Sequence, residues 1–311
     1  MEKYTQFRDK STGISPFLPI SRNNINVIGK STDSKNILTN TVNLIFKSSL
    51  FTLRIIIITP FVLLSIILSF TLGYSNYFLK SLNRFILILS GLHSLEYSVQ
   101  NLKLRNVSAQ NFPKKNEMYF LNFSNPLDFL ILSIISNTEF IILIPNSKGQ
   151  LEEFNSFLKF VSKALCGFND DIKGDPIKYK NLQDKTIYIF GEGTTSNGKS
   201  ILPFSINQEQ FNEFIFNLNN VSKINSLGIR ISPTLTTPLE TPLAVYIWRI
   251  LSNWSFNYKV RLNLVDEKKP FETNLTKIRS SLGNNGKIKV LGNELTYMQK
   301  IQFIKSYKGP K

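Results

Sequence analysis

The segment MYFLNFSNPLD, from Met118 to Asp128, places a short apolar and aromatic run directly before a polar loop. Met118–Phe123 has the length and composition of a buried strand, and Asp128 stands where a helix would begin. Beyond residue 100, four more short apolar runs alternate with stretches of helical spacing: Phe140–Ile144, Thr186–Phe190, Leu227–Ile231 and Tyr258–Val265. This alternation predicts an α/β fold in which a mixed sheet is flanked by helices.

Helical spacing of apolar residues is clearest in two stretches between and after these runs. From Phe154 to Leu165 the pattern predicts a helix that packs on the core and stops near Gly167. In Glu294–Tyr307 apolar residues recur three positions apart, with lysines elsewhere: Leu295, Met298, Ile301 and Ile304. This second pattern predicts an amphipathic helix that either packs on the sheet or lies on lipid.

The longest apolar stretch, Ile55–Leu72, holds about eighteen residues without a charge, near the lower limit for crossing a hydrocarbon core. A buried core helix is the alternative, but core helices usually carry a polar stripe. Pro60 removes a helix hydrogen bond inside the stretch, so a full span and a re-entrant hairpin with both ends cytosolic are both open, the hairpin being slightly preferred. The sequence therefore predicts an N-terminal membrane-embedded helix or helical hairpin.

Composition divides the chain into three regions and restricts its partners. We expect a loosely ordered polar segment over residues 1–44, a membrane-anchoring region over 45–95 and the α/β domain over 96–311. The chain has 37 Lys and Arg against 21 Asp and Glu, a formal net charge of +16, which favours an anionic partner. The basic residues are spread along the chain without an RNA-binding strand motif or paired Cys/His spacing, so neither nucleic acid nor a metal is expected. The single cysteine, Cys166, fits a reducing compartment.

Two loops that follow strand candidates carry the polar residues suited to chemistry, because α/β folds place their sites at strand ends. The first is Asn122–Asp128, in which Asp128 either acts on a ligand or simply caps a helix, capping being favoured from the residues alone. The second is Phe190–Ser196, in which two glycines flank Glu192 and hydroxyl side chains follow. This loop is suited to a phosphate or a glycerol group, and a tight glycine turn is the alternative.

The segment Gly193–Ser200 also satisfies the pattern of a nucleotide-binding P-loop, and Leu262–Glu267 is similar to the strand that accompanies such loops. A P-loop must open directly into a helix whose N-terminus faces the phosphates. Pro203 would break that helix beyond its first turn. A nucleotide-binding protein is therefore the more remote alternative, although Lys199 is suited to meet an anion.

The two loops resemble the first and third motifs of the glycerolipid acyltransferase superfamily, which read Asn-His, four residues, Asp, and Phe-Pro-Glu-Gly-Thr-Arg-Ser. Order and spacing match. Within the superfamily the chain is similar to the fungal lysophosphatidate acyltransferases, from end to end. The segments that carry this likeness are Met1–Thr5, Arg8-Asp9, Thr12–Ile14, Pro16–Pro19, Ser124–Asp128, Gly193-Thr194, Ser196–Ser200 and Leu202–Ser205.

The resemblance implies that residues 96–311 are an acyltransferase-like domain that converts lysophosphatidate to phosphatidate, with acyl-CoA as co-substrate and no other cofactor. It implies a place in glycerolipid, triacylglycerol and lipid-droplet metabolism. The partners are then acyl-CoA, lysophosphatidate and membrane lipid. The implied location is the endoplasmic reticulum membrane and lipid droplets, with the soluble domain facing the cytosol.

Carried over by position, Asp128 matches the catalytic Asp, while Glu192, Gly193, Thr194 and Ser196 match the acceptor-binding third motif. The chain departs from the family pattern in three places, where Phe123 replaces the basic His, Gly191 the Pro and Thr195 the phosphate-binding Arg. We expect Asp128 to act on the acceptor hydroxyl directly or through water. The cation for the phosphate would come from Lys199, Lys173 or Arg230. The only histidine, His93, has no carboxylate at motif spacing. An inert relative that binds lipid or acyl-CoA, with a lipid-droplet or vacuolar-sorting function, is the alternative.

Overall fold

The structure is a computed structural model that describes residues 2–20, 34–74, 76–108, 111–166, 172–218, 221–265, 274–284 and 288–308. Seven of its strands form one sheet in the order β1-β8-β7-β2-β5-β3-β4. These strands are β1 (Leu92–Val99), β2 (Glu117–Leu121), β3 (Phe140–Pro145), β4 (Leu151–Glu153), β5 (Thr186–Phe190), β7 (Lys223–Ile231) and β8 (Phe256–Leu264). A short parallel pair, β6 (Ser200–Ile201) and β9 (Lys289–Val290), lies apart from it.

The large sheet is mixed, as the sequence predicts. Strands β7, β2, β5 and β3 run parallel, as do β1 and β8, whereas β7 and β8 are antiparallel and so are β3 and β4. The five predicted strands are confirmed with small shifts at their ends. Strand β1 is missing from the prediction, because a register irregularity between Leu92 and Ser94 and polar residues along the strand hide its alternation.

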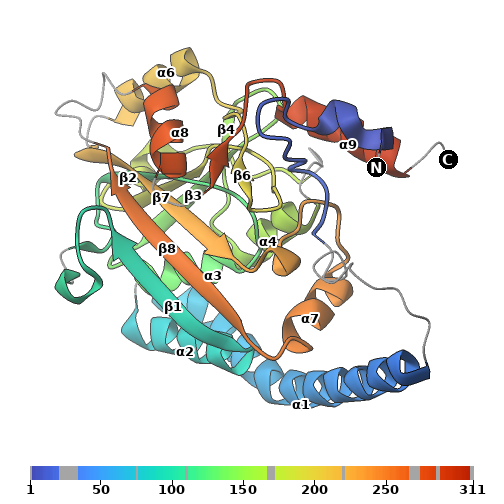
Figure 1. The fold of residues 1–311 in the computed structure, drawn as a ribbon. Coiled ribbons are helices and arrows are strands. Elements are labelled where there is room, and N and C mark those ends of the chain that lie inside the picture. Colours follow the sequence, from blue (N-terminus) through green and yellow to red (C-terminus); the bar gives the residue numbers. More distant parts are fainter. Residues whose placement is uncertain are drawn as a thin grey trace.

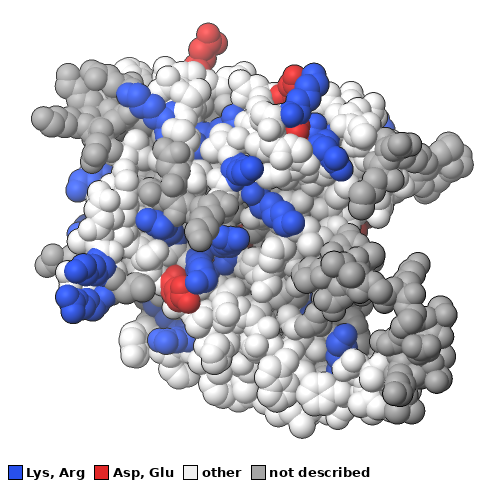
Figure 2. Space-filling model, in the orientation of Figure 1, with Lys and Arg blue, Asp and Glu red and all other residues white. Residues whose placement is uncertain are grey.

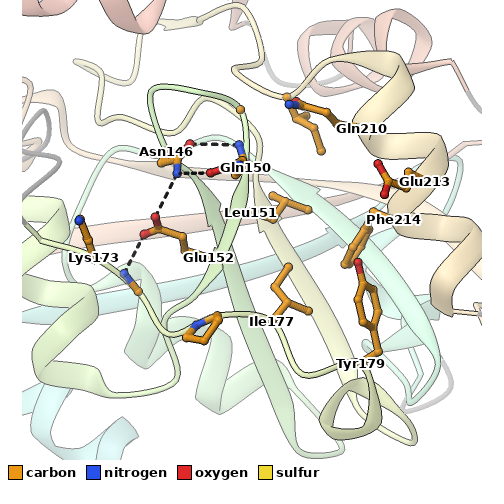
Figure 3. A pocket seen from close by; sticks show the side chains of 14 residues that line it. Asn146, Gln150, Leu151, Glu152, Lys173, Ile177, Tyr179, Gln210, Glu213 and Phe214 are labelled. Carbon is orange, nitrogen blue, oxygen red and sulfur yellow. Dashed lines mark hydrogen bonds between the residues drawn. The ribbon is translucent and has the colours of Figure 1, made fainter.

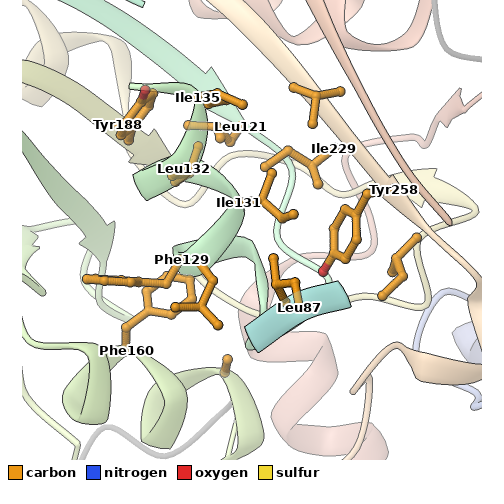
Figure 4. Close-up of a cluster of buried hydrophobic side chains, with 14 of the residues drawn as sticks. Leu87, Leu121, Phe129, Ile131, Leu132, Ile135, Phe160, Tyr188, Ile229 and Tyr258 are labelled. Carbon is orange, nitrogen blue, oxygen red and sulfur yellow. The ribbon is translucent and has the colours of Figure 1, made fainter. Parts of the chain in front are cut away.

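Helices cover both faces of the sheet at its centre, so the strands β2, β3 and β5 are buried on both sides. In β2, Tyr119 and Leu121 belong to one apolar cluster and Met118 and Phe120 to another. Figure 4 shows the first cluster, where side chains of the sheet meet those of α2, α3 and α4. The helices on that face are α1 (Ser34–Leu72), α2 (Tyr77–Leu89), α3 (Asp128–Ile135), α4 (Phe157–Cys166) and α7 (Leu243–Leu251). Helices α5 (Tyr179–Leu182), α6 (Gln208–Leu218) and α8 (Leu275–Asn284) lie on the other.

The predicted apolar stretch lies inside α1, which continues through Pro60 as one helix and runs along the base of the molecule beside α2 and α7 (Figure 1). It forms a helical hairpin with α2. The Ser65 hydroxyl donates to the Asn83 side chain at 2.6 Å, and the Phe61 and Phe85 rings pack edge to face. One side of α1 faces the domain, where Ile58 is buried, and the opposite side is exposed, where Ile56 is 73% accessible.

The two ends of the chain pack against each other. Rings from residues 2–20 surround Phe303 of α9 (Tyr297–Lys308), and the Asp9 carboxylate accepts a hydrogen bond from the Gly292 amide at 3.0 Å. The expectation of loose order is therefore wrong for residues 2–20, because this aromatic cluster holds them. The boundaries at residues 44 and 95 stay predictions; α1 begins at Ser34, and β1 crosses residue 95.

The C-terminal stretch is helical as predicted, and its predicted apolar side is buried in part, at Leu295 and Ile304. Met298 is exposed, whereas Lys300 and Phe303 are fully buried. The strict three-residue spacing misses Lys300 and Phe303, because a helix repeats every 3.6 residues and not every three. The buried face packs on the N-terminal segment and not on the large sheet.

Candidate active site

The two motif loops meet at one edge of the sheet, because β2, β5 and β7 are parallel and end there. The Ser196 amide donates to the Phe123 carbonyl at 2.9 Å, and the Thr237 amide donates to the Ser124 carbonyl at 3.1 Å. The Thr195 hydroxyl donates to the Thr237 carbonyl at 2.6 Å. Three segments that are distant in sequence are thus joined by direct hydrogen bonds.

Asp128 is the first residue of α3 and is fully buried. Its Oδ2 accepts a hydrogen bond from the Asn125 amide at 3.1 Å, and its Oδ1 accepts one from the Tyr258 hydroxyl at 3.2 Å. Burial raises the pKa of the Asp128 carboxyl to about 7, against hydrogen bonds from Asn125, Ser124 and Tyr258 that favour the charged form. A carboxyl group with this pKa is poised to exchange a proton near neutral pH.

Two tyrosines that no sequence pattern singled out complete the surroundings of Asp128. The Tyr246 hydroxyl donates to Asn125 Oδ1 at 2.6 Å, and the Tyr258 hydroxyl lies 3.3 Å from the same oxygen. Tyr258 reaches this edge because β8 runs antiparallel to β7, which pairs Tyr258 with Ile231 at the end of β7. Burial, followed by the nearby Asp128 charge, raises the pKa of both phenols well above its usual value. They are therefore neutral hydrogen-bond donors.

Phe123, at the position where the superfamily has its base, is part of the core. Its ring packs at 4.8 Å from the Phe190 ring and 5.4 Å from the Phe160 ring, measured between centroids, and is fully buried. Asn122, just before it, extends the pairing of β2 with β7 by exchanging two hydrogen bonds of 2.8 Å with the Ile229 backbone. The histidine that would carry the proton in the family mechanism is therefore replaced here by a phenylalanine that packs in the core.

Glu192 is fully buried, and no donor among the described residues meets hydrogen-bond geometry at either carboxylate oxygen. Burial raises its pKa well above the usual value, although the Leu202 amide, the Arg279 charge, the Phe123 amide and the Lys300 charge all favour the ionised form. A buried carboxyl group without a hydrogen-bond partner destabilises the folded state, so its presence calls for an explanation such as a role in function.

The rest of the third-motif loop is a tight, buried turn. Gly193 has φ of +68°, and a Cβ there would lie 2.8 Å from the Pro145 carbonyl oxygen, so glycine is required by both conformation and space. The Ser196 hydroxyl lies 3.4 Å from the Ser200 carbonyl. The structure thus brings five predicted site residues onto two neighbouring loops: Glu192, Gly193, Thr194 and Ser196 on one and Asp128 on the other. Their roles stay predictions.

Lys300 supplies the positive charge nearest to this loop. Its fully buried ammonium group donates to Thr194 Oγ1 at 2.8 Å and to the Thr195 carbonyl at 2.5 Å. Burial lowers its pKa to about 7, Glu192 acting to raise it and Lys163 to lower it. One signal in the sequence could have revealed Lys300. It lies three residues after Tyr297 and three before Phe303, and thus on an apolar side of the predicted helix.

The three cations proposed for the phosphate are not buried with the motif loops. Lys199, Lys173 and Arg230 are all exposed. Lys173 lines a separate cavity of about 540 Å³ between the turn after β3 and α6 (Figure 3), and no lining residue of that cavity belongs to Asn122–Asp128 or Gly191–Ser200. Figure 2 shows basic side chains spread over the face of β1 and β8 with few acidic ones in view. Within the described residues, no group of three His, Cys, Asp or Glu side chains is suited to a metal.

The P-loop alternative does not fit the backbone. Ser200 enters strand β6, so Gly193–Ser200 does not open into a helix as a P-loop does. The acidic residues of the accompanying pattern, Asp266 and Glu267, lie outside the described residues.

An apolar groove of about 350 Å³ lies between the helices at the base of the molecule. Its walls come from α1, α2, α4 and α7 and from Pro126, Leu127 and Leu130 around the start of α3. Tyr246 lines the groove and donates its hydroxyl to Asn125, so this one side chain connects the groove wall to the buried polar cluster of Asp128. This arrangement suits a molecule with a long hydrocarbon chain and a reactive polar end.

Comparisons with known proteins agree with the resemblance that the two motif loops carry. No family model matches the chain. It is similar to lysophosphatidic acid:oleoyl-CoA acyltransferase 1 of Saccharomyces cerevisiae, with 27% identity over 99% of this chain and 97% of that protein. It is also similar to a putative lysophosphatidic acid:oleoyl-CoA acyltransferase of Schizosaccharomyces pombe, with 26% identity over 85% of this chain and 84% of that protein.

Among solved structures, the chain aligns with the 1-acyl-sn-glycerophosphate acyltransferase PlsC of Thermotoga maritima over 87% of this chain and 99% of that one. The identity is 12% and the TM-score 0.38, too low to assign a common fold. The two motif loops and the two yeast relatives make the chain similar to the glycerolipid acyltransferase superfamily. Within it, the chain is similar to the lysophosphatidic acid:oleoyl-CoA acyltransferases of yeasts.

Proposed function

We propose that the protein transfers an acyl group from acyl-CoA to the free hydroxyl of lysophosphatidate, giving phosphatidate. The observation that carries this proposal is the apolar groove lined by Tyr246, whose hydroxyl binds Asn125 beside Asp128. A hydrocarbon chain in the groove brings its polar end to a carboxyl group whose pKa of about 7 suits proton transfer. The names of the yeast relatives support the acceptor and the acyl-CoA donor.

In the proposed reaction the acceptor oxygen attacks the thioester carbonyl carbon, the carbon–sulfur bond breaks, and the hydroxyl proton passes through Asp128 to the departing thiolate. Asp128 acts directly or through water, since Phe123 accepts no proton. The Tyr258 hydroxyl, 3.2 Å from Asp128 Oδ1, orients the carboxyl group. Glu192, Gly193, Thr194 and Ser196 form the acceptor side of the site, and Lys199 is the exposed cation next to it.

The proposal places the chain at a membrane. Thr41–Ser69 of α1 is long and apolar enough to cross one, with a mean hydropathy of 2.4, and its outward side is exposed. Because α1 runs along the base beside α2, we propose that the hairpin is embedded and that the groove opens to lipid. The endoplasmic reticulum and lipid droplets, with the α/β domain on the cytosolic side, are the locations that we propose from the family resemblance.

The test is turnover by the purified full chain in liposomes, supplied with radiolabelled acyl-CoA and lysophosphatidate. We expect labelled phosphatidate from the parent and none from Glu192→Gln, which keeps the shape of the buried side chain but removes its acidity. Equal rates for the parent and Glu192→Gln would remove the third-motif loop from the mechanism.

A catalytically inert relative that binds lipid or acyl-CoA is the second candidate. Phe123 in the aromatic core and the complete burial of Asp128 and Glu192 favour it. Acyl-CoA binding without labelled product, in the same liposomes, would select this candidate over the enzyme.

A further inference from the structure

A second cavity lies at the base of the molecule, on the other side of α7 from the apolar groove. It measures about 390 Å³ and is lined by Pro19 and Ile20, by α1 and α7, and by the segment from Pro233 to Thr236 that contains η5 (Pro233–Leu235). It shares no lining residue with the groove. Nothing in the proposed acyl transfer uses it.

The cavity is positively charged. Lys47 of α1 and Arg249 of α7 line it, and none of its eleven lining residues is acidic. Neither cation forms an ion pair with another described residue. The carbonyl groups at the end of α7 would repel an anion, but Arg54 occupies them: its guanidinium donates to the Leu251, Asn253 and Trp254 carbonyls at 3.1, 2.5 and 2.9 Å.

The surroundings of the cavity are those of a membrane interface. Trp248, in its wall, packs 4.8 Å from the Phe51 ring of α1, and Trp254, which is 67% accessible, packs 5.8 Å from the Phe46 ring. Aromatic side chains beside Lys and Arg are the residues enriched where a lipid head group meets the hydrocarbon. The exposed apolar side of α1 continues from this point.

We propose that this cavity binds the phosphate head group of an anionic glycerolipid, with Lys47 and Arg249 as its ligands. The inference rests on the proposed membrane location but not on catalysis. The wall of the cavity also belongs to the candidate site, since the Leu235 carbonyl accepts a hydrogen bond from the Asn125 side chain at 2.5 Å. Thr236 faces Gly198 of the third-motif loop, where an added Cβ would lie 3.3 Å from its methyl carbon. A bound head group thus touches the segment that supports both motif loops.

The chain has two tryptophans, so Trp254→Phe leaves Trp248 as the single fluorophore, in the wall of the cavity. The full chain in detergent is titrated, without acyl donor, with dihexanoyl phosphatidate, hexanoyl lysophosphatidate, glycerol 3-phosphate and uncharged dihexanoylglycerol. We expect a saturable change in Trp248 emission with the two phosphate-bearing lipids and none with dihexanoylglycerol.

In the same background, Lys47→Gln and Arg249→Gln should each weaken phosphatidate binding about tenfold, as the loss of a charge-assisted contact does. Arg84→Gln removes an exposed charge from α2 at the same base and should leave binding unchanged. An emission change of equal size with dihexanoylglycerol, or equal affinities for Arg249→Gln and Arg84→Gln, would overturn the proposal.

The titration also identifies the source of the phosphate. Preference for hexanoyl lysophosphatidate over phosphatidate makes the cavity the acceptor's own site, and equal affinity makes it a site for a neighbouring membrane lipid; both outcomes support the proposal. Because no acyl donor is present, binding by a protein without turnover would reject the proposed function alone. Turnover without binding would reject this cavity alone.

Discussion

The apolar base and the strand-end loops are built in opposite ways. At the base, large apolar side chains of α1, α2 and α7 are exposed, and a groove lies open between the helices. At the strand ends, the polar residues of both motifs are closed off, with Asp128 and Glu192 at 0% accessibility. The comparison shows that the region recognised from composition is open to ligands, whereas the region recognised from motifs is covered by the rest of the chain.

The cover comes from both ends of the chain. The Asn197 side chain in the third-motif loop donates to the Ser15 and Leu18 carbonyls at 2.9 and 3.2 Å, and Lys300 of α9 binds the same loop at Thr194. Asp9 ties the two ends together, and hydrogen bonds from Ser11, Gly292 and Thr12 outweigh its burial and hold its pKa well below the usual range. The open and closed regions meet at Tyr246, which lines the groove and binds Asn125.

The largest expected effect tests whether the closed region does chemistry. Asp128→Asn should lower turnover on the order of a hundredfold or more, because an amide accepts no proton at neutral pH. The Asn side chain keeps the shape and an acceptor for the Tyr258 hydroxyl, so the free energy of unfolding should change little near pH 5. Initial rates and melting temperatures are compared with those of Asp175→Asn, which alters an exposed carboxylate. Full turnover in Asp128→Asn would exclude Asp128 as the base.

The same substitution should change how stability depends on pH. The pKa of Asp128 is raised by burial to about 7, so between about pH 4 and pH 7 the folded state holds a proton that the unfolded state has lost. The contribution of this bound proton to the free energy of unfolding is therefore full below about pH 4 and is lost as pH rises through 7. Asp128→Asn lacks it, and its free energy of unfolding relative to the parent should rise across this range by on the order of a few kcal/mol. Parallel curves from denaturant titrations would mean that Asp128 does not titrate there.

A third prediction tests the open region. Thr59 is exposed on α1 and lines the apolar groove, so Thr59→Trp should fill the groove and lower turnover of long-chain substrates about tenfold, with short-chain substrates much less affected. Thr52→Trp is the matched control, since Thr52 is exposed on the same helix but does not line the groove. The ratio of rates with long and short chains decides. An unchanged ratio in Thr59→Trp would mean that the hydrocarbon chain binds elsewhere.

The sequence predicts local features well where one physical signal dominates. Thr186–Phe190 is a strand with the predicted ends, because five residues buried on both faces leave a continuous apolar run. The bulge at His93 hides β1 from the same method, and in α9 the three-residue spacing includes the exposed Met298 and misses the buried Lys300 and Phe303. Pattern-based prediction depends on a regular repeat of the right length.

The site is less predictable, because its partners come from afar in the chain. The motif spacing identifies Asp128 and Glu192, and the structure places their loops side by side. More than a hundred residues of sequence separate these loops from the side chains that contact them: Tyr246 of α7, Tyr258 of β8 and Lys300 of α9. The antiparallel pairing of β8 positions Tyr258, and the packing of α9 positions Lys300. No local pattern encodes such contacts.

The smallest expected effect concerns how the closed region is kept closed. Lys300→Met removes the ammonium group that binds Thr194 Oγ1 and the Thr195 carbonyl, but it also removes the cost of burying a charge. We therefore expect the melting temperature to change little while the third-motif loop opens more often. Trypsin cleavage after Lys199, whose side chain is exposed, should become a few times faster.

Lys305→Met, which changes an exposed lysine of the same helix, separates this local effect from the loss of any positive charge in α9. The pKa of Lys300, about 7, allows a second measurement, in which the pH is varied. Above this pH the side chain is a neutral amine, which donates fewer hydrogen bonds than an ammonium group. The cleavage rate of the parent should therefore approach that of Lys300→Met as pH rises from about 7 to 9. Dividing the parent's rate by that of Lys300→Met at each pH removes the pH dependence of trypsin itself. A ratio that stays constant with pH, together with equal cleavage in Lys300→Met and Lys305→Met, would show that Lys300 does not hold the loop closed.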